Sequence, residues 1–160
     1  MGCVDVVIET PRGSAQKYDY NPETHFFELK KILPAGMVFP YDFGFVPDTK
    51  GEDGDPLDVI VISEFHSFPG CVIKCRLIGV IKAEQSAEKG KKKMIRNDRY
   101  LAIPKLSNTF EKIKDIDDLS KSIVREIEDF FVDYNKIQGK EFKALEKLHA
   151  DDAKRMIKSL

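Results

Sequence analysis

The stretch from Glu52 to Asp58 has the sequence EDGDPLD and is followed at once by VIVI at residues 59–62. It places four carboxylates within seven residues. Asp, Gly and Pro favour a turn, whereas a short run of Val and Ile is typical of a buried strand. Gly54 permits a backbone angle that a side chain would forbid, and Pro56 fixes its own φ. The sequence therefore predicts an acidic turn at the entrance of a rigid strand.

Clustered carboxylates repel one another, and hard divalent cations remove that repulsion. Mg²⁺ binds carboxylate oxygens together with phosphate oxygens, so a magnesium site is one interpretation of the turn. A solvated turn without a ligand is the other. A calcium-binding EF-hand is excluded, because a loop starting at Asp53 would place Asp58 where that motif needs Gly.

The composition is that of a globular protein. The chain has 160 residues, 42% hydrophobic and 33% charged, and a net charge of −1, so we expect a single domain over residues 1–160 without a general attraction to nucleic acid or membrane. No apolar run approaches the length of a membrane span, and the first residues lack the pattern of a signal peptide. The three cysteines fit free thiols in a reducing compartment. We therefore expect a cytoplasmic protein.

The first two thirds of the chain carry short strand patterns separated by turn residues. Gly79 is expected to form a bend or bulge in the longest of them. Consecutive short strands without crossover helices predict a small closed or nearly closed barrel. The expected strands are Val4–Glu9, Lys17–Tyr20, Phe26–Leu29, Phe39–Val46, Asp58–Ile62, Val72–Ile81 and Tyr100–Ile103.

After residue 116 the hydrophobic period changes from two to between three and four, which predicts an amphipathic helix packed on the barrel. Asp117-Asp118 is the expected cap and Gly139 the expected end. The apolar face is expected to contain Ile123, Ile127, Phe130, Phe131, Tyr134 and Ile137.

A short final helix is expected to begin at Asp151 or Asp152 and to run to Leu160. Its inward side chains would be Met156, Ile157 and Leu160. The predicted fold class is therefore mainly β with α, a barrel flanked by about two helices.

Other charged residues lie on segments expected to face the acidic turn. Lys17 and Asp19 share one face of their strand, because side chains two residues apart point the same way. The residues alone favour a metal-dependent phosphate chemistry. The further candidates are Glu9, Lys31, Glu84, Asp98, Arg99, Tyr134 and Lys136.

Residues 52–59 resemble the signature Asp-Gly-Asp-Pro-x-Asp-Val of the soluble family I inorganic pyrophosphatases of bacterial type. The resemblance covers nearly the whole chain, because other family segments follow in the same order and spacing. They are residues 7–9, 17–19, 39–45, 69–70, 79–80 and 102–104, then Phe130-Phe131-x-x-Tyr134 and Gly139-Lys140.

This resemblance implies a five-stranded β-barrel of the OB type flanked by two helices. It implies hydrolysis of inorganic pyrophosphate to two orthophosphates with several Mg²⁺ ions, for which Mn²⁺ is a possible substitute. It also implies a homo-oligomer, usually a hexamer in short bacterial-type chains.

The resemblance also assigns roles to the candidate residues. Asp53, Asp55 and Asp58 would hold two activating metals bridged by water, and Asp55 would be the general base. Glu84 and Asp98 would form a second acidic pair that brings in metal with the substrate. Glu9 would complete the metal site, whereas Lys17, Lys31, Arg99 and Tyr134 would contact the phosphates, with Tyr134 also counted as catalytic.

Several positions depart from the family pattern. Lys31 stands where most members have Arg, and a lysine cannot form the bidentate fork to phosphate. Phe39 and Phe43 replace tyrosines, and Tyr41 could supply one of the missing hydroxyls. Asn135 replaces a Lys, for which Lys136 is the expected substitute.

The second acidic pair departs as well. Asn97-Asp98-Arg99 replaces an Asp-x-Lys pattern, so either Asp98 has taken the metal role or Asn97 occupies it as a neutral ligand. Glu84 stands where the family usually has Asp.

Two alternatives to an active pyrophosphatase follow. OB-type barrels commonly bind single-stranded nucleic acid through a basic groove with stacking aromatics. The substitutions could also give a pyrophosphatase homologue with reduced activity.

Overall fold

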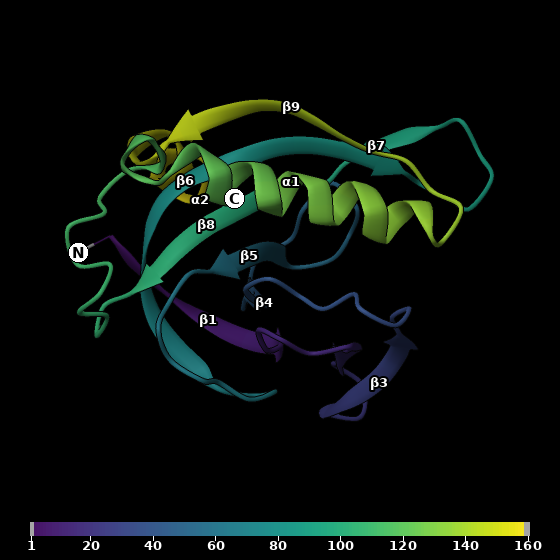
Figure 1. The fold of residues 1–160 in the computed structure, drawn as a ribbon, viewed down its shortest axis with the longest axis horizontal. Helices are drawn as coiled ribbons and strands as arrows, with labels where there is room; N and C mark the ends of the chain where they lie inside the picture. The colour runs from purple at the N-terminus through teal and green to yellow at the C-terminus, as the bar shows by residue number, and fades with distance from the viewer. Residues whose placement is uncertain (1, 159–160) are drawn as a thin grey trace.

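The computed structural model describes residues 2–158, in which a barrel of strands is flanked by helices (Figure 1). In chain order the elements are β1 (Cys3–Thr10), β2 (Gln16–Asn21), β3 (Phe26–Ile32), β4 (Asp42–Val46), β5 (Leu57–Val61), β6 (Val72–Ser86), β7 (Met94–Arg96), β8 (Arg99–Pro104), the 3₁₀ helix η1 (Ile116–Asp118), α1 (Lys121–Lys136), β9 (Phe142–His149) and α2 (Ala150–Lys158).

Five strands close on themselves. The hydrogen-bonded order is β1-β4-β5-β8-β6, and β6 pairs again with β1. All of these pairings are antiparallel except that of β5 with β8. The prediction of a mainly β fold with a small closed barrel is therefore confirmed, and closure leaves these strands without free edges.

One close approach between strands explains a glycine in β4. A Cβ atom at Gly44 would lie 2.2 Å from the carbonyl oxygen of Val7 in β1, a separation that no side chain could tolerate. The absence of a side chain at Gly44 therefore allows β1 and β4 to pair this closely.

Strand β6 is longer than the sequence predicted, because it continues past Ile81 to Ser86. Its second half leaves the barrel and pairs with β7 and β9, two strands that the sequence analysis missed. The register of β6 against β8 shifts between Leu77 and Gly79, which confirms the expected irregularity. Strand β9 escaped prediction because most of its side chains are exposed or half-buried and charged residues interrupt its alternation.

Helix α1 begins later than expected. Its N-cap is Ser120, whose side chain accepts a hydrogen bond from the Ser122 amide. The expected cap, Asp117-Asp118, lies instead within η1, which Asp115 caps. The predicted cap was therefore wrong, because a short 3₁₀ helix with its own cap precedes α1.

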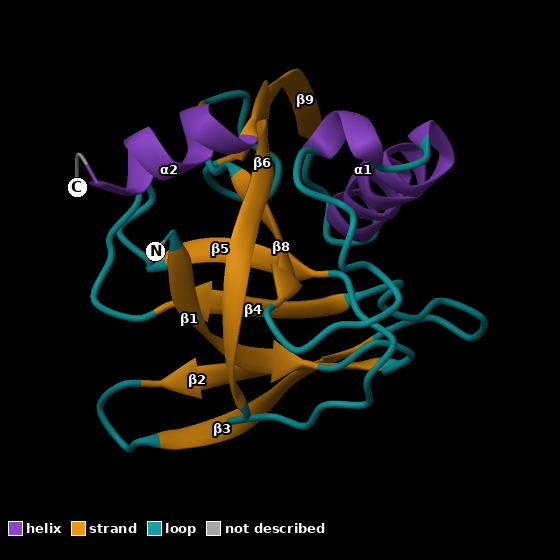
Figure 2. Cartoon of the chain, turned by 90° about the vertical axis from the view of Figure 1, so that its left-hand side faces the viewer, coloured by secondary structure: helices purple, strands orange, loops and turns teal. Residues whose placement is uncertain are grey.

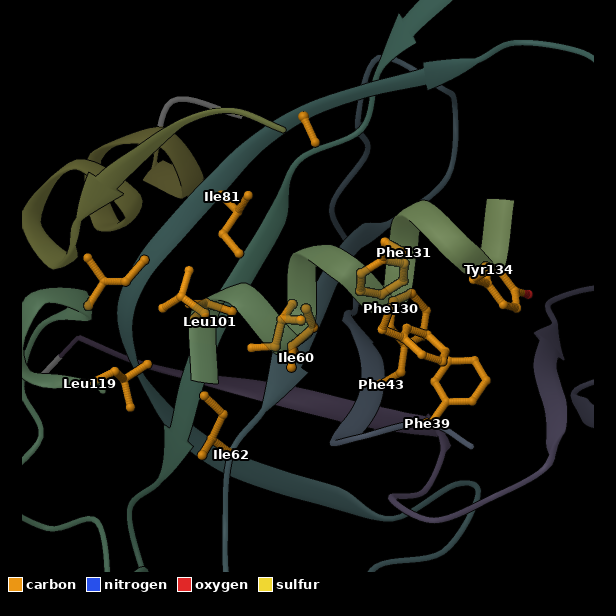
Figure 3. Packing of buried hydrophobic residues seen from close by; sticks show 14 of the residues in the cluster. Phe39, Phe43, Ile60, Ile62, Ile81, Leu101, Leu119, Phe130, Phe131 and Tyr134 are labelled. Atoms are coloured by element: carbon orange, nitrogen blue, oxygen red, sulfur yellow. The ribbon is translucent and has the colours of Figure 1, made fainter. Parts of the chain in front are cut away.

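The buried face of α1 packs against one end of the barrel. Phe130, Phe131 and Tyr134 lie against Phe39 and Phe43 (Figure 3). The prediction that Ile137 also faces the barrel was wrong, because this residue is the C-cap and is 49% exposed.

Helix α2 starts at Ala150, and the side chain of Asp152 accepts a hydrogen bond from the backbone amide of His149. Met156 and Ile157 pack against a second core cluster, as expected. The expected contact of Leu160 lies outside the described residues. Among the described residues, no helix is long and apolar enough to cross a membrane.

Strands β2 and β3 form a separate two-stranded sheet below the barrel (Figure 2). The Thr10 hydroxyl at the end of β1 donates to the Tyr18 carbonyl and accepts from the Tyr18 amide, 3.1 Å in each case. The amide of Leu33 also donates to the carbonyl of Ala15 at 2.8 Å. This hairpin carries Lys17 and Lys31 beside the barrel end that α1 covers.

Candidate active site

A cleft of about 880 Å³ lies where the acidic turn, the β2–β3 hairpin and the end of α1 meet. Of the residues predicted for the site, it is lined by Glu9, Lys17, Lys31, Asp53, Asp55, Asp58, Arg99 and Tyr134. The structure thus brings together side chains from five separate parts of the chain.

The acidic turn is ordered by its own backbone. The amide of Gly51 donates to the carbonyl of Asp55 at 2.8 Å, and the amide of Asp55 donates to a carboxylate oxygen of Asp53 at 3.1 Å. Gly54 has φ +88°, which favours glycine. Asp58 lies one residue into β5, between Phe45 on β4 and Arg99 on β8.

We call Glu9, Asp53, Asp55 and Asp58 the acidic wall. Burial raises the pKa of Glu9 to about 7, although Lys17 and the Tyr20 amide act in the opposite direction. Burial likewise raises the pKa of Asp58 to about 6, although the positive charge of Arg99 opposes this rise. Burial therefore makes it costly for Glu9 and Asp58 to carry their negative charges, and a bound cation would offset that cost.

The donor set of the acidic wall fits hard divalent cations, which bind through carboxylate oxygens. Four carboxylates from β1, the turn and β5 line one side of the cleft. No sulfur or imidazole group lines the cleft among the described residues, so its chemistry suits Mg²⁺ or Mn²⁺ better than softer metals.

Positive side chains line the cleft as well. Lys17 is only 8% exposed and forms an ion pair with Asp19. Lys31 contacts Gln138, and its Nζ lies 5.2 Å from the centroid of the Tyr134 ring. These two lysines present cationic groups that an anionic ligand could contact.

Arg99 is buried and held in place on several sides. Its guanidinium lies 4.6 Å from the centroid of the Phe131 ring and 5.4 Å from that of Phe142. Its Nη2 donates to Gln85 Oε1 at 2.9 Å, and its Nη1 donates to the carbonyl of Asn97 at 2.6 Å. We call Gln85, Asn97 and Arg99 the amide wall.

The structure does not bring Glu84, Asp98 or Lys136 to the cleft. Glu84 precedes Gln85 in β6, so the two side chains point to opposite faces of the strand. Asp98 accepts hydrogen bonds from Arg96 at 2.8 Å and lines a smaller cavity of about 360 Å³ behind the acidic turn.

Lys136 is exposed at the end of α1 and does not line the cleft. Asn135 does line it, but its amide is buried and donates to the carbonyl of Phe131 at 2.8 Å. The cation on this side is Lys140, which the sequence analysis did not assign to the site. The Gly139-Lys140 pair after the helix was the signal that could have identified it.

The two phenylalanines that replace tyrosines of the family pattern lie at the cleft. Phe39 and Phe43 line the cleft and are buried, at 1% and 6% exposure. Tyr41 is half-buried and contributes to a small cavity beside α1 instead, so it does not replace a missing hydroxyl in the cleft.

A second group of metal-ligating side chains lies away from the cleft. Asp115, Asp117 and His149 have ligand atoms within 4.8 Å of one another. The Asp115 carboxylate already accepts hydrogen bonds from the amides of Asp117 and Ala150 and lies 2.9 Å from His149 Nδ1. The hydrogen bond with Asp115 raises the pKa of His149. This group therefore ties η1 to the start of α2.

Comparison with known proteins gives a consistent result. The family model described as inorganic pyrophosphatase matches residues 6–160. The chain is 35% identical over 139 residues to an inorganic pyrophosphatase of Synechocystis, covering 87% of this chain and 78% of that protein. It is 36% identical over 140 residues to one of Thermus thermophilus, covering 88% and 76% respectively.

Solved structures agree with the sequence comparison. The inorganic pyrophosphatase of Thermus thermophilus superimposes with a TM-score of 0.90 at 30% identity, covering 99% of this chain and 88% of that one. The inorganic pyrophosphatase of Helicobacter pylori gives a TM-score of 0.88 at 31% identity, covering 98% and 90%. The chain belongs to the inorganic pyrophosphatase family.

Proposed function

We propose that the protein hydrolyses inorganic pyrophosphate to two orthophosphates and depends on divalent metal ions for this activity. The observation that carries the proposal is the cleft itself, which brings the acidic wall together with Lys17, Lys31 and Arg99. Carboxylates that bind metal and cations that bind phosphate are the two components that phosphoryl transfer needs. Family membership supports the same substrate.

The acidic wall would hold the metal ions, with Asp53 and Asp55 on the turn, Asp58 on β5 and Glu9 on β1. Mg²⁺ is the proposed ion and Mn²⁺ a substitute, since both prefer oxygen ligands. When bound, such ions supply neutralisation of phosphate charge and a lower pKa for the attacking water.

Asp55 is the proposed general base. It is exposed to the cleft, and its carboxylate makes no hydrogen bond to another side chain among the described residues, so it is available to accept a proton from water. The other aspartates of the wall are more buried than Asp55.

Tyr134 is proposed to donate a hydrogen bond to a phosphate oxygen. Burial raises the pKa of its hydroxyl, so the proton stays on the oxygen near neutral pH. Lys17, Lys31 and Arg99 would contribute positive charge to the phosphates, where electrostatic stabilisation accelerates the reaction.

The protein is further proposed to act as a single domain, in the cytoplasm, as a homo-oligomer, with a hexamer as the family's usual assembly. Large apolar side chains are exposed on the chain, including Phe26, Ile32 and Leu106 at 71%, 73% and 81%. Association would remove such surface from water. Light scattering on a sizing column measures the number of subunits.

The nucleic-acid-binding alternative is less well supported by the cleft. Its carboxylates are Glu9, Asp19, Glu28, Asp48, Asp53, Asp55 and Asp58, which makes seven, against five cations, Lys17, Lys30, Lys31, Arg99 and Lys140. A net negative cleft would repel a phosphodiester backbone, which proteins bind mainly through positive charge.

The deciding experiment measures phosphate release from pyrophosphate with and without Mg²⁺, with ATP as a control substrate. Fast, Mg²⁺-dependent release from pyrophosphate alone is the expected result. A folded sample that releases no phosphate with either Mg²⁺ or Mn²⁺ would contradict the proposal and favour a homologue with reduced activity.

A further inference from the structure

The cleft presents neutral amides where the sequence analysis expected a second pair of carboxylates. Gln85 and Asn97 line the cleft, whereas the neighbouring acids Glu84 and Asp98 do not. Among the described residues, therefore, no carboxylate from β6 or from the segment before β8 lines the cleft.

The acids are held away by identifiable contacts. A carboxylate oxygen of Asp98 accepts hydrogen bonds from the Ala83 amide at 3.0 Å and from two nitrogens of Arg96 at 2.9 and 3.1 Å. Moving Asp98 into the cleft would break all of these. Glu84 would need a one-residue shift of β6, which would also turn the core residue Ala83 outward.

The amides are already engaged with charged groups. Gln85 Oε1 accepts a hydrogen bond from Arg99, and the side-chain amide of Asn97 helps to lower the pKa of Asp58, against the larger effect of burial. Arg99 also lies 3.5 Å from Asp58. A divalent ion bound by Gln85 Oε1 would thus have to displace, or lie beside, a buried guanidinium.

We infer that Gln85 and Asn97 keep divalent ions on the acidic wall, and that the amide wall meets the phosphate with Arg99 in place of a further metal ion. This inference rests on the metal-dependent function proposed above. Amide oxygens carry no net charge, so they bind a hard cation more weakly than carboxylates do. The two residues would therefore set how many ions accompany the substrate.

The experiment counts Mn²⁺ ions bound per chain, from the electron paramagnetic resonance signal of free Mn²⁺, with and without methylenediphosphonate as a non-hydrolysable probe. The variants are Asn97→Asp and the double variant Gln85→Asp/Asn97→Asp. Asn108→Asp is the control, since it adds the same charge as Asn97→Asp at an exposed position outside the cleft.

With the probe present, the double variant is expected to bind one more Mn²⁺ per chain than the wild type, and the control is expected to match the wild type. Equal counts for the wild type and the double variant would overturn the inference. If the double variant does not fold, the Mn²⁺ count of Asn97→Asp is compared with that of the wild type instead. This single variant keeps the hydrogen bond from Arg99, because the acceptor is the backbone carbonyl of residue 97.

Phosphate release measured in parallel separates this inference from the proposed function. A wild type without turnover would contradict the function but leave the difference in Mn²⁺ counts standing. An active wild type whose Mn²⁺ count equals that of the double variant would support the function and refute the role of the two amides.

Discussion

The acidic wall and the amide wall line the same cleft and meet where Arg99 lies 3.5 Å from Asp58, but they are built in opposite ways. Three of the four acids on the acidic wall come from seven consecutive residues. Asp53 and Asp55 flank Gly54 on the turn, and Asp58 is the second residue of β5. The amide wall brings together Gln85 from β6, Asn97 from the connection between β7 and β8, and Arg99 from β8, whose guanidinium packs on the rings of Phe131 and Phe142. A local turn can supply metal ligands, whereas a fixed buried cation requires tertiary packing. Substitutions on the first wall should therefore affect catalysis, and those on the second should affect stability as well.

Asp55→Asn tests the acidic wall and should have the largest effect. Loss of the proposed base is expected to lower kcat by roughly 10²-fold or more, since general bases contribute on this scale. The thermal midpoint should stay close to that of the wild type, because the Asp55 side chain is exposed. Glu52→Gln on the same turn is the control and should keep most of the activity, because Glu52 does not line the cleft. A near-normal kcat for Asp55→Asn would remove this residue from the mechanism.

Phe131→Ala tests the amide wall. Phe131 is 3% exposed and packs against the Arg99 guanidinium, Phe43 and Phe142, so its removal should leave a cavity. The free energy of unfolding is expected to fall by about 3–5 kcal/mol.

Urea titration of Phe131→Ala measures this loss. Val132→Ala, on the exposed side of the same helix, is the control and should change the unfolding free energy by far less. Equal losses for the two variants would show that α1 does not support the amide wall.

Gly54→Ala should affect the acidic wall through its backbone. Nothing lies within 4 Å of the added Cβ, so the penalty comes only from φ +88° and should be about 1–2 kcal/mol. Gly36→Ala provides a matched control, since Gly36 has φ +86° and equally open surroundings. Both variants should lose similar stability, but only Gly54→Ala should weaken Mg²⁺ binding in calorimetry. Unchanged Mg²⁺ affinity would show that metal binding does not depend on the backbone conformation at residue 54.

Lys31→Arg should have the smallest effect, and in the favourable direction. A guanidinium can form a bidentate contact with phosphate that the lysine cannot. We expect the KM for pyrophosphate to fall by roughly five-fold, corresponding to about 1 kcal/mol for one added hydrogen bond. Steady-state kinetics at saturating Mg²⁺ would measure this change. A higher KM would indicate that the contact of Lys31 with Gln138 contributes more to substrate binding than a bidentate contact between arginine and phosphate would.

The two walls also differ in how far the sequence could predict them. The acidic wall could be predicted because its turn, its glycine and the following strand are contiguous. The amide wall could not, because a shift of one residue decides whether Glu84 or Gln85 faces the cleft. The register of β6 against β9 shifts between Lys82 and Ala83, just before this point, and no local pattern marks such a shift. Likewise, Asp98 turns away only because Arg96 and the Ala83 amide bind it.

At the level of the fold, the barrel could be predicted from its strand and turn pattern, but β9 could not. Its partner is the second half of β6, and this pairing joins residues about sixty positions apart. The start of α1 was misplaced because Asp115 caps a 3₁₀ turn that precedes the Ser120 cap. Caps depend on short-range geometry, and two of them in series give one ambiguous signal.

The β2–β3 hairpin has a consequence for how the protein captures its ligand. An isolated pair of strands is marginally stable in water, and this hairpin contacts the rest of the chain through few backbone hydrogen bonds. We therefore expect the segment that carries Lys17 and Lys31 to open locally more readily than the barrel does. An anion bridging these lysines to the barrel would shift that equilibrium towards the ordered form. Ordering would oppose part of the binding energy, so heat should weaken substrate capture well before the barrel melts.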